Sequence, residues 1–383
     1  MTPPLGGLLV ADFSRVLAGP LATMTLGDLG ADVVKVERPG TGDETRSWAP
    51  PYGPDGTSAY YLAVNRNKRA ITLELSTVDG REAARALALR ADVLVENFAP
   101  GTMARFGLGY DDLAEHNPRL VYASVTGFGP DAGLPGYDFL VQAVGGLMSV
   151  TGDPQGVPTK VGVALVDVLA GQNLVAGVLA ALYARERTGR GQHVEVNLLA
   201  SALAALVNQA STYLNAGAVP GRMGNRHPSI APYETLRTAD RPIAVAVGND
   251  GQFGRLCGVL GLPDDPRFAD NPSRVRNRDA LSTALESRLA TAPAAHWLEA
   301  LGNAGVPCGP VNDIAEAFAL AERLGLAPVV RPGVRTASGP ASVASPLGVT
   351  GVAYRLPPPE LGEHTTEVLS WLASGGGPVL DVQ

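Results

Sequence analysis

The first third of the chain alternates between short apolar runs and longer stretches with helical spacing. Apolar runs of about four to eight residues are typical of strands buried on both faces. Five such runs occur, at residues 8–13, 32–36, 70–75, 92–95 and 120–126. Helical stretches lie between them at residues 21–29 and 78–90. This alternation predicts an α/β fold with a mostly parallel sheet covered by helices on both faces.

A segment rich in proline and glycine, residues 43–67, interrupts this alternation. It contains the consecutive prolines Pro50-Pro51 and the pair Tyr60-Tyr61. A loop of this length inside a sheet domain is usually either disordered or part of a site. The two tyrosines argue against disorder, so we predict that the segment contributes to a site.

The middle of the chain predicts a second group of regular elements. Residues 167–187 have helical spacing, and residues 193–197 predict a further strand. Residues 198–214 form another helical stretch, which has too few polar positions for a surface helix. We therefore expect this helix to lie inside a domain or between subunits.

A connecting region follows, and the chain then predicts a smaller α+β unit. A strand at residues 243–247 precedes helices at 252–260, 276–290, 293–304 and 314–324. The tail carries short strand-like pieces and one helix at residues 363–373. Because 383 residues are too many for one ordinary core, we predict two domains. The larger contains residues 1–215 and 329–383, and the smaller contains residues 225–328.

Composition restricts the class of protein without identifying a site. Apolar residues make up 45% of the chain and charged residues 17%, as in globular proteins. The net charge is −7 and no basic run occurs, which argues against a nucleic-acid partner. Cys257 and Cys308 lack C-x-x-C spacing, so we predict neither a disulfide framework nor a zinc site, and a reducing compartment fits.

No segment predicts a signal peptide or a membrane span. The N-terminus lacks a basic region followed by an apolar one. The longest apolar stretch, residues 168–183, is interrupted by Gly171, Gln172, Asn173 and Gly177. We interpret it as too short and too polar to cross a bilayer. The expectation is a soluble, cytoplasmic protein that has no membrane partner.

Asp167 is the most informative single residue, because it stands between Val166 and Val168 at the start of a predicted helix. Burying an unpaired carboxylate is costly, so its position needs a reason. It can cap the helix by accepting hydrogen bonds from free backbone N–H groups. It can also act as a nucleophile whose charge the helix terminus stabilises. The residues alone favour the cap, and the two roles can coexist.

Other motifs give weaker signals. Residues 127–133 partly match a dinucleotide fingerprint, but the third glycine is one residue late and two prolines disrupt the following helix. The histidines lack metal-ligand spacing, so no metal site is predicted, and the loop at 227–233 is the most site-like of their surroundings. Arg38 directly follows residues 32–36 and is the best phosphate candidate. The other basic candidates are Arg46, Lys68, Arg69 and Arg105.

Longer blocks of sequence resemble the family III CoA-transferases, and the resemblance covers nearly the whole chain. The blocks are residues 12–20 (DFSRVLAGP), 26–39 (LGDLGADVVKVERP), 42–46 (GDETR), 65–69 (NRNKR), 96–101 (ENFAPG), 188–192 (TGRGQ) and 361–365 (LGEHT). The family includes formyl-CoA:oxalate, carnitine and succinyl-CoA:dicarboxylate transferases. A sister branch is α-methylacyl-CoA racemase.

The resemblance implies a Rossmann-like large domain, formed by the N-terminal half and the C-terminal tail, with a smaller domain between them. It also implies a homodimer whose two chains interlock like links. The apolar helix at residues 198–214 and the long tail are consistent with that arrangement.

The resemblance further implies a set of site residues. Asp167 corresponds to the catalytic aspartate, and Tyr60, His227, Ser229 and Tyr233 correspond to groups on the acyl or acceptor side. The positions that correspond to CoA contacts are Val16, Leu17, Ala18, Arg38, Leu73, Leu75, Asn97, Phe98, Arg105 and Tyr137. A CoA thioester is the substrate in this family, and no permanently bound cofactor or metal is expected.

Two departures from formyl-CoA:oxalate transferase bear on the acceptor. Leu17 stands where that enzyme has glutamine, and the loop at residues 227–233 is shorter. Both argue against a small, oxalate-like acceptor. The blocks around residues 15–20, 60–61, 65–68 and 229–233 are most similar to the succinyl-CoA-dependent dicarboxylate branch.

The implied reaction passes through a mixed anhydride on Asp167 and an aspartyl-CoA thioester. Backbone N–H groups at the start of the helix, and in a glycine-bearing loop, are the expected oxyanion donors.

Three alternatives stay open. The racemase branch uses a Gly-His-Asp block and a glutamate, but this chain has Gly136-Tyr137-Asp138 and Asp250 at those places, and tyrosine is a poor proton relay near pH 7. A dinucleotide-dependent oxidoreductase has only residues 127–133 in its favour. The third alternative is a CoA-binding protein without turnover.

Overall fold

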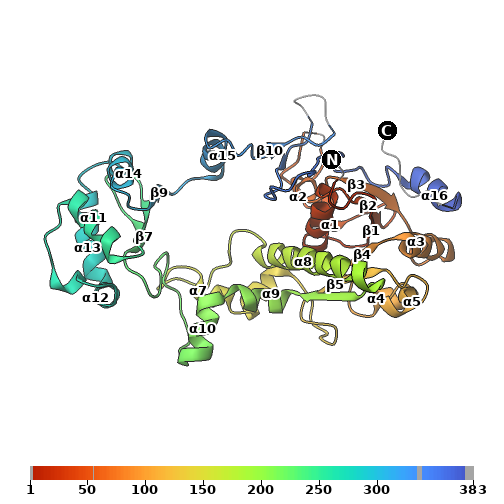
Figure 1. Cartoon of the computed structure of the whole chain (residues 1–383), viewed down its shortest axis with the longest axis horizontal. Helices are drawn as coiled ribbons and strands as arrows, with labels where there is room; N and C mark the ends of the chain where they lie inside the picture. The colour runs from red at the N-terminus through yellow and green to blue at the C-terminus, as the bar shows by residue number, and fades with distance from the viewer. Residues whose placement is uncertain (1–2, 55, 334–338, 376–383) are drawn as a thin grey trace. The chain divides into compact units, whose positions relative to one another are not determined.

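The computed structural model describes residues 3–54, 56–333 and 339–375 (Figure 1). The chain divides into two compact units. The first contains Met1–Gly146, Val161–Ser211 and Ala327–Gln383, and the second contains Leu147–Lys160 and Thr212–Leu326. Residues 147–160, which we predicted within the large domain, therefore group with the second unit. The end of the predicted tail, residues 376–383, lies outside the described residues.

The first unit is built on a six-stranded parallel sheet, as the alternating pattern predicts. Its order is β3-β2-β1-β4-β5-β6, and every neighbouring pair is parallel. All residues of the interior strands β2 and β4 are buried, which explains why valine and leucine appear on both faces of each strand in the sequence. The strands are β1 (Leu9–Asp12), β2 (Asp32–Glu37), β3 (Lys68–Thr72), β4 (Val93–Glu96), β5 (Val121–Thr126) and β6 (His193–Asn197).

β3 begins at Lys68 rather than at residue 70, because the first two charges of the strand are paired inside the protein. Lys68 Nζ lies 3.0 Å from Asp12 Oδ2, and Arg69 Nη1 lies 3.6 Å from Asp32 Oδ1. A pattern of apolar residues does not reveal buried charges of this kind, so the prediction placed the strand too late.

Helices cover both faces of the sheet. Alternate strand residues point to opposite faces, and Val34 and Leu94 pack with α3 (Val78–Arg90) and α16 (Thr365–Ala373) in one apolar cluster. On the other face, α8 (Leu165–Thr188) packs along α1 (Ala18–Asp28) and across β5 and β6. The shorter helices are α4 (Thr102–Arg105), α5 (Tyr110–Ala114), α6 (Asp138–Val144) and α9 (Leu198–Ala205).

α8 is long and apolar enough to cross a membrane by length and composition. The prediction that this stretch is too short and too polar is therefore wrong by both criteria, and the helix continues beyond residues 168–183 in both directions. Its inner face nevertheless packs as a core helix does. Ala170 and Leu174 are fully buried, and a side-chain carbon added at Gly171 would lie only 2.7 Å from Ala18 O.

The predicted loop at residues 43–67 is more regular than the sequence suggests. The 3-10 helix η1 (Glu44–Ser47) begins at Asp43, whose side chain accepts a hydrogen bond from Thr45 N. α2 (Ala59–Ala63) begins at Ser58, whose hydroxyl accepts from Tyr60 N. Helices this short contain too few residues to show a period in the sequence.

The tail binds the edge strand β3 of the first unit. Asn67 Oδ1 accepts hydrogen bonds from Arg355 N and Leu356 N, and Asn67 N donates to Leu356 O. Further along, His364 N donates to Ala70 O. Two short strands of the tail pair antiparallel: β10 (Val329–Val330) and β11 (Ser342–Val343).

The second unit has its own small antiparallel sheet and its own apolar core. The predicted helix at 276–290 corresponds to α13, which begins at Arg278 because Asn277 leaves helical geometry (φ −108°, ψ 26°) and ends the preceding helix, α12. The strands are β7 (Tyr233–Leu236), β8 (Ile243–Ala246) and β9 (Cys308–Pro310). The helices are α7 (Leu147–Val150), α11 (Asp250–Leu260), η2 (Pro266–Phe268), α12 (Asn271–Arg276), α13 (Arg278–Leu289), α14 (Ala294–Asn303) and α15 (Ile314–Arg323).

The apolar segment 198–214 forms two helices, α9 and α10 (Val207–Ala216), rather than one. The break falls at Val207, which has φ 37°. α10, which the structure describes in full, contains no buried residue, and Leu214 is 75% exposed. The prediction that the whole segment lies inside a domain is wrong for the single chain. A position between subunits stays a prediction.

Candidate active site

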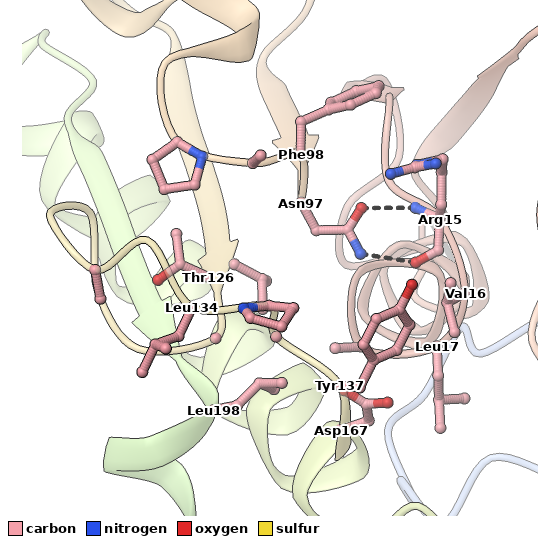
Figure 2. A pocket seen from close by; sticks show the side chains of 18 of the residues that line it. Arg15, Val16, Leu17, Asn97, Phe98, Thr126, Leu134, Tyr137, Asp167 and Leu198 are labelled. Atoms are coloured by element: carbon pink, nitrogen blue, oxygen red, sulfur yellow. Dashed lines mark hydrogen bonds between the residues drawn. The ribbon is translucent and has the colours of Figure 1, made fainter. Parts of the chain in front are cut away.

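The order of the sheet creates a crevice between β1 and β4. The strand order reverses between them, so the connections after β1 and β4 leave in opposite directions. Ligands of open parallel sheets bind beyond the carboxyl ends of the strands at such a switch point. A cavity of about 610 Å³ is lined by the segments that follow β1, β4 and β5 and by Asp167 of α8 (Figure 2).

The side chain of Asn97 joins the two loops at the switch point. Its Oδ1 accepts a hydrogen bond from Arg15 N at 2.8 Å, and its Nδ2 donates to Arg15 O at 2.7 Å (Figure 2). The amide therefore extends the pairing of β1 and β4 beyond the last backbone hydrogen bond. Asn97, which the resemblance makes a CoA contact, lines the cavity and at the same time fixes its shape.

Val16 adopts φ 69°, a left-handed conformation that a β-branched residue seldom enters. Its N–H donates to the Asp43 carboxylate, 3.2 Å from Oδ2, and Asn97 holds the residue before it. A strained conformation persists only where the surrounding contacts enforce it. The turn that results places Val16, Leu17 and Ala18 in the cavity wall.

Two buried ion pairs support this turn. Lys35 Nζ lies 2.9 Å from Asp43 Oδ2 and donates to Ser14 O. Lys68 Nζ lies 3.0 Å from Asp12 Oδ2. Burial alone raises the pKa of the Asp12 carboxyl, but Lys68 and Lys35 outweigh burial and lower this pKa to about 2. These two ion pairs therefore stabilise the fold around the turn.

Asp167 lies in the first turn of α8 and lines the cavity. Burial raises the pKa of its carboxyl to about 7, and the charge of Asp138 adds to the rise. Within the part of the chain that the structure describes, the Asp167 carboxylate accepts no hydrogen bond. A half-buried carboxylate without a partner is unusual and marks a candidate reactive group.

Asp167 does not cap its own helix. Ala164 occupies the N-cap position of α8, and its side chain has no hydrogen-bond acceptor. Asp138 Oδ1 caps the helix instead, because it accepts hydrogen bonds from Val166 N at 2.8 Å and from Asp167 N at 3.4 Å. The cap role that the residues alone favoured for Asp167 is therefore wrong, and its carboxylate is left uncommitted.

Two tyrosines predicted for the site lie close to this carboxylate. Burial raises the pKa of the Tyr60 phenol to about 12, with the charges of Asp167 and Asp138 as further causes. The Tyr60 ring packs edge-on against Trp48, with centroids 5.2 Å apart, and Trp48 lines the cavity. Tyr137 also lines it and is 63% exposed.

A second cavity, of about 730 Å³, shares part of its wall with the first: Arg15, Glu44 and Phe98 line both. Four predicted CoA positions line this second cavity, namely Arg38, Leu73, Leu75 and Phe98. The Arg38 side chain is 74% exposed, and its Nε is 3.9 Å from Glu74. Its guanidinium is therefore accessible to a phosphate.

The other basic candidates are placed differently. Arg46 forms two 2.8 Å hydrogen bonds with the Glu37 carboxylate, and Lys68 and Arg69 are buried in the ion pairs described above. Arg105 lines neither cavity; it is exposed on α4, where its Nη2 donates to Thr102 Oγ1 at 3.1 Å. Only Arg38 of this group meets the sequence expectation of an accessible cation at a strand end.

The remaining predicted substrate groups belong to the second unit. His227 and Tyr233 rings lie 5.3 Å apart, and Ser229 N donates to His227 Nδ1 at 3.1 Å. The loop is further held by Arg278, which donates to His227 O and Pro228 O. The loop is thus ordered within its own unit, and its role towards substrate stays a prediction.

The partial dinucleotide fingerprint does not form a phosphate site. No helix begins within residues 127–133, and the next helix, α6, starts at Asp138. The backbones of Gly127 and Gly136 pack together so closely that a side-chain carbon at Gly127 would lie 2.4 Å from Gly136 Cα. These glycines close a loop, and the oxidoreductase alternative loses its only support.

The sequence matches the model of CoA-transferase family III over residues 5–365. The chain belongs to this family. It is 43% identical to a succinate–glutarate CoA-transferase of Agrobacterium fabrum, with 97% of the chain and 96% of the relative covered. It is 46% identical to an acetyl-CoA:oxalate CoA-transferase of Acetobacter aceti, with 82% of each covered. It is 41% identical to the human succinyl-CoA:glutarate CoA-transferase, with 96% and 85% covered.

The fold agrees with solved structures of the same family. A CAIB/BAIF family protein from Brucella suis superposes with a TM-score of 0.86 at 42% identity, covering 97% of this chain and all of that one. The protein described here is thus an enzyme of the CoA-transferase type, with CoA thioesters as substrates, as the resemblance implied.

One residue of the site escaped the sequence analysis. Asp138 appeared there only as the aspartate of the racemase-like block, yet it caps the helix that carries Asp167. The signal was the alanine at position 164, since a helix that begins without a side-chain acceptor needs one from elsewhere.

Proposed function

We propose that this enzyme transfers CoA from succinyl-CoA to a dicarboxylic acid and that Asp167 carries the acyl group during the exchange. The observation that carries the proposal is the Asp167 carboxylate, which lines the switch-point cavity and is not used as a cap. The relatives from Agrobacterium fabrum and human, named for succinate or succinyl-CoA and for glutarate, support the choice of donor and acceptor.

In the first half of the reaction, a carboxylate oxygen of Asp167 attacks the thioester carbonyl of the acyl-CoA. The C–S bond breaks, and the CoA thiolate leaves with the electron pair, so that a mixed anhydride of Asp167 and the donor acid remains. The thiolate then attacks the Asp167 carbonyl carbon. The donor departs as a carboxylate, and Asp167 is left as a CoA thioester.

In the second half, the acceptor carboxylate attacks the Asp167 thioester and expels the CoA thiolate, which forms a second anhydride. The thiolate attacks the acceptor's carbonyl carbon, which yields the new acyl-CoA and restores the Asp167 carboxylate. One thioester replaces another, so the sequence of steps needs neither ATP nor a bound cofactor.

The oxyanions of these steps need hydrogen-bond donors, and the first turn of α8 cannot supply them as the sequence suggested. Leu165 N donates to Val163 O, and the next two N–H groups donate to Asp138. These donors are already engaged, so the oxyanion site must lie elsewhere.

The start of α1 is the better source. Leu17 and Ala18 line the cavity, and their backbone N–H groups have no acceptor among the residues that the structure describes. The strained turn at Val16 fixes their direction. We assign the oxyanion site to these two N–H groups, with the helix dipole of α1 behind them.

The test is an exchange assay. The purified protein is incubated with succinyl-CoA and glutarate, and glutaryl-CoA is measured by liquid chromatography with mass detection. Asp167→Ala should lower the rate by at least about a thousandfold, while Asp79→Asn, which removes an exposed carboxylate from the start of α3, should not. Exchange at the normal rate in Asp167→Ala would falsify the nucleophile assignment.

The acceptor needs its own test, because one relative is named for oxalate and acetyl-CoA. Leu17, which lines the cavity, argued against a small acceptor. A competition assay between glutarate and oxalate tests this argument. With succinyl-CoA as donor, glutarate should be preferred over oxalate. A preference for acetyl-CoA and oxalate would replace the proposed substrates and leave the role of Asp167 in place.

We further propose that two chains assemble as a homodimer and that the enzyme works in the cytoplasm. The support for a dimer is the exposed apolar surface of α10, including Val207, Tyr213 and Leu214. The support for the compartment is that Cys257 and Cys308 are both free thiols, as expected where disulfides do not persist.

A further inference from the structure

α8 begins without a cap of its own. Ala164 occupies the N-cap position, and the first turn of any helix leaves backbone N–H groups without partners inside the helix. Asp138, which begins the neighbouring helix α6, supplies the missing acceptor through Oδ1, 2.8 Å from Val166 N and 3.4 Å from Asp167 N. One carboxylate thus holds the backbone of the residue that we propose as the nucleophile.

The second oxygen of Asp138 is held as firmly. Gln142 Nε2 donates to Asp138 Oδ2 at 2.7 Å. The same side chain also donates to Val163 O at 3.3 Å and accepts from Val161 N at 2.9 Å. Gln142 is fully buried, so these bonds have no competition from water. The pair Asp138–Gln142 therefore fixes both the start of α8 and the segment that leads into it.

We propose that Asp138, supported by Gln142, is a positioning residue for the transfer reaction: it caps α8 in place of Asp167 and keeps a negative charge beside the nucleophile. The inference rests on the proposed role of Asp167. By taking over the cap, Asp138 leaves the Asp167 carboxylate free of hydrogen bonds and aimed at the cavity. By its charge, it makes that carboxylate less stable and therefore more reactive towards a carbonyl.

The charges around Asp167 are few. Asp138 faces it from α6 and Tyr60 from α2, and the Tyr60 phenol stays neutral because burial raises its pKa to about 12. Arg15, Glu44 and Asp131 line the same cavity; Arg15 and Glu44 are paired with each other, and Asp131 is not among the charges that shift the pKa of Asp167. Burial first and Asp138 second raise the pKa of the Asp167 carboxyl to about 7. Removing the charge at position 138 should therefore lower that pKa.

The sign of the pH effect follows from the mechanism. Only the ionised Asp167 attacks, so kcat/KM rises with pH up to the pKa of this carboxyl and then levels off. Asp138→Asn keeps an oxygen for the α8 cap, removes the charge and replaces the acceptor of Gln142 Nε2 by an NH2 group. We expect the acidic limb of the kcat/KM profile to move to lower pH by about one unit, with a lower plateau because the carboxylate is a weaker nucleophile.

A direct reading of the pKa separates this effect from activity. The chain is labelled with [4-¹³C]aspartate, and the Asp167 resonance, assigned by its loss in Asp167→Ala, is titrated by NMR. In Asp138→Asn the midpoint should fall by about one unit, and in the control Asp79→Asn it should stay in place. An unchanged midpoint in folded Asp138→Asn would overturn the proposal.

Gln142→Leu gives an independent test, because it leaves the charge of Asp138 and removes its support. kcat should fall by about tenfold as the start of α8 loosens, while the acidic limb does not move to lower pH. An unchanged kcat would contradict the positioning role. Should wild-type protein show no CoA exchange, or Asp167→Ala retain it, the proposed function fails, whereas the NMR titration still reports whether Asp138 controls the carboxyl.

Discussion

The N–H of Val16 donates to the Asp43 carboxylate. Lys35, which does not line the cavity that contains Asp167, pairs with Asp43 and keeps it charged. Burial alone raises the pKa of the Asp43 carboxyl, but Lys35 and the N–H of Thr45 outweigh burial and lower it. The shape of the cavity wall at Val16 and Leu17 therefore depends on an ion pair hidden behind it.

Lys35→Met should lower the free energy of unfolding by about 3–5 kcal/mol, because it leaves the Asp43 carboxylate buried without its partner. Urea unfolding followed by circular dichroism measures the change. Arg38→Met removes an exposed cation and should cost less than about 1 kcal/mol. Equal losses in the two variants would show that the buried pair contributes no more than a surface one.

For single residues, the sequence indicated which side chains belong to the site but not which atoms they contact. Asp167 drew attention because a carboxylate stood among valines, and the residues alone made it a cap. The actual cap, Asp138, comes from 29 residues earlier in the chain. No local pattern reports a hydrogen bond across that separation, so the choice between cap and nucleophile required the fold.

At the scale of elements, the interior strands of the parallel sheet were predicted well because both of their faces are buried. β2 and β4 have no solvent-facing side, so apolar residues predominate in their centres, with Lys35 of β2 as a buried, paired exception. The errors fell at the ends of elements: β3 begins earlier because its first charges are paired inside the protein, and α13 begins later than predicted because Asn277 leaves helical geometry. For the apolar segment 198–214, a place inside a domain is wrong for α10 and a place between subunits stays a prediction, because apolar composition does not say which surface covers a helix.

The contact between α1 and α8 leaves no room for a side chain at Gly171. In Gly171→Ala the new methyl group would meet Ala18 O at 2.7 Å, and backbone cannot turn aside as a side chain can. We expect the free energy of unfolding to fall by about 1–3 kcal/mol. We also expect kcat to fall, because Ala18 and Asp167 line the same cavity from these two helices.

A matched control exists on α11. Gly254 has no atom within 4 Å of the position that a side-chain carbon would take, so Gly254→Ala should leave stability unchanged or raise it by about 0.5–1 kcal/mol. Thermal unfolding and the exchange assay measure both variants. A Gly171→Ala variant as stable and active as the control would show that the two helices separate without cost.

At the scale of the whole molecule, the exposed apolar side chains of α10 bear on assembly. Val207, Tyr213 and Leu214 are 70%, 59% and 75% exposed in the single chain. Large apolar side chains exposed together on one helix are typical of an interface. The sequence indicated this possibility through its lack of polar positions, but interlocking came only from the family resemblance.

The chain should sediment as a dimer in analytical ultracentrifugation. Leu214→Glu should shift the equilibrium towards monomer at micromolar concentration, because it places a charge in an apolar contact. Val78→Glu, at a 59% exposed position at the start of α3, should remain dimeric. A monomeric wild-type protein, or a Leu214→Glu variant with unchanged sedimentation, would contradict the proposed assembly.

The hydrogen bonds between Asn67 and residues 355–356 also affect the order in which parts of the protein fold during synthesis. β3 is synthesised early, yet the segment that binds its edge leaves the ribosome almost three hundred residues later. The first unit therefore cannot be completed while the second is still being translated, although domains generally fold as units during synthesis. The second unit, which is nearly continuous in sequence, should become protease-resistant first in a ribosome-bound nascent chain, and β3 last.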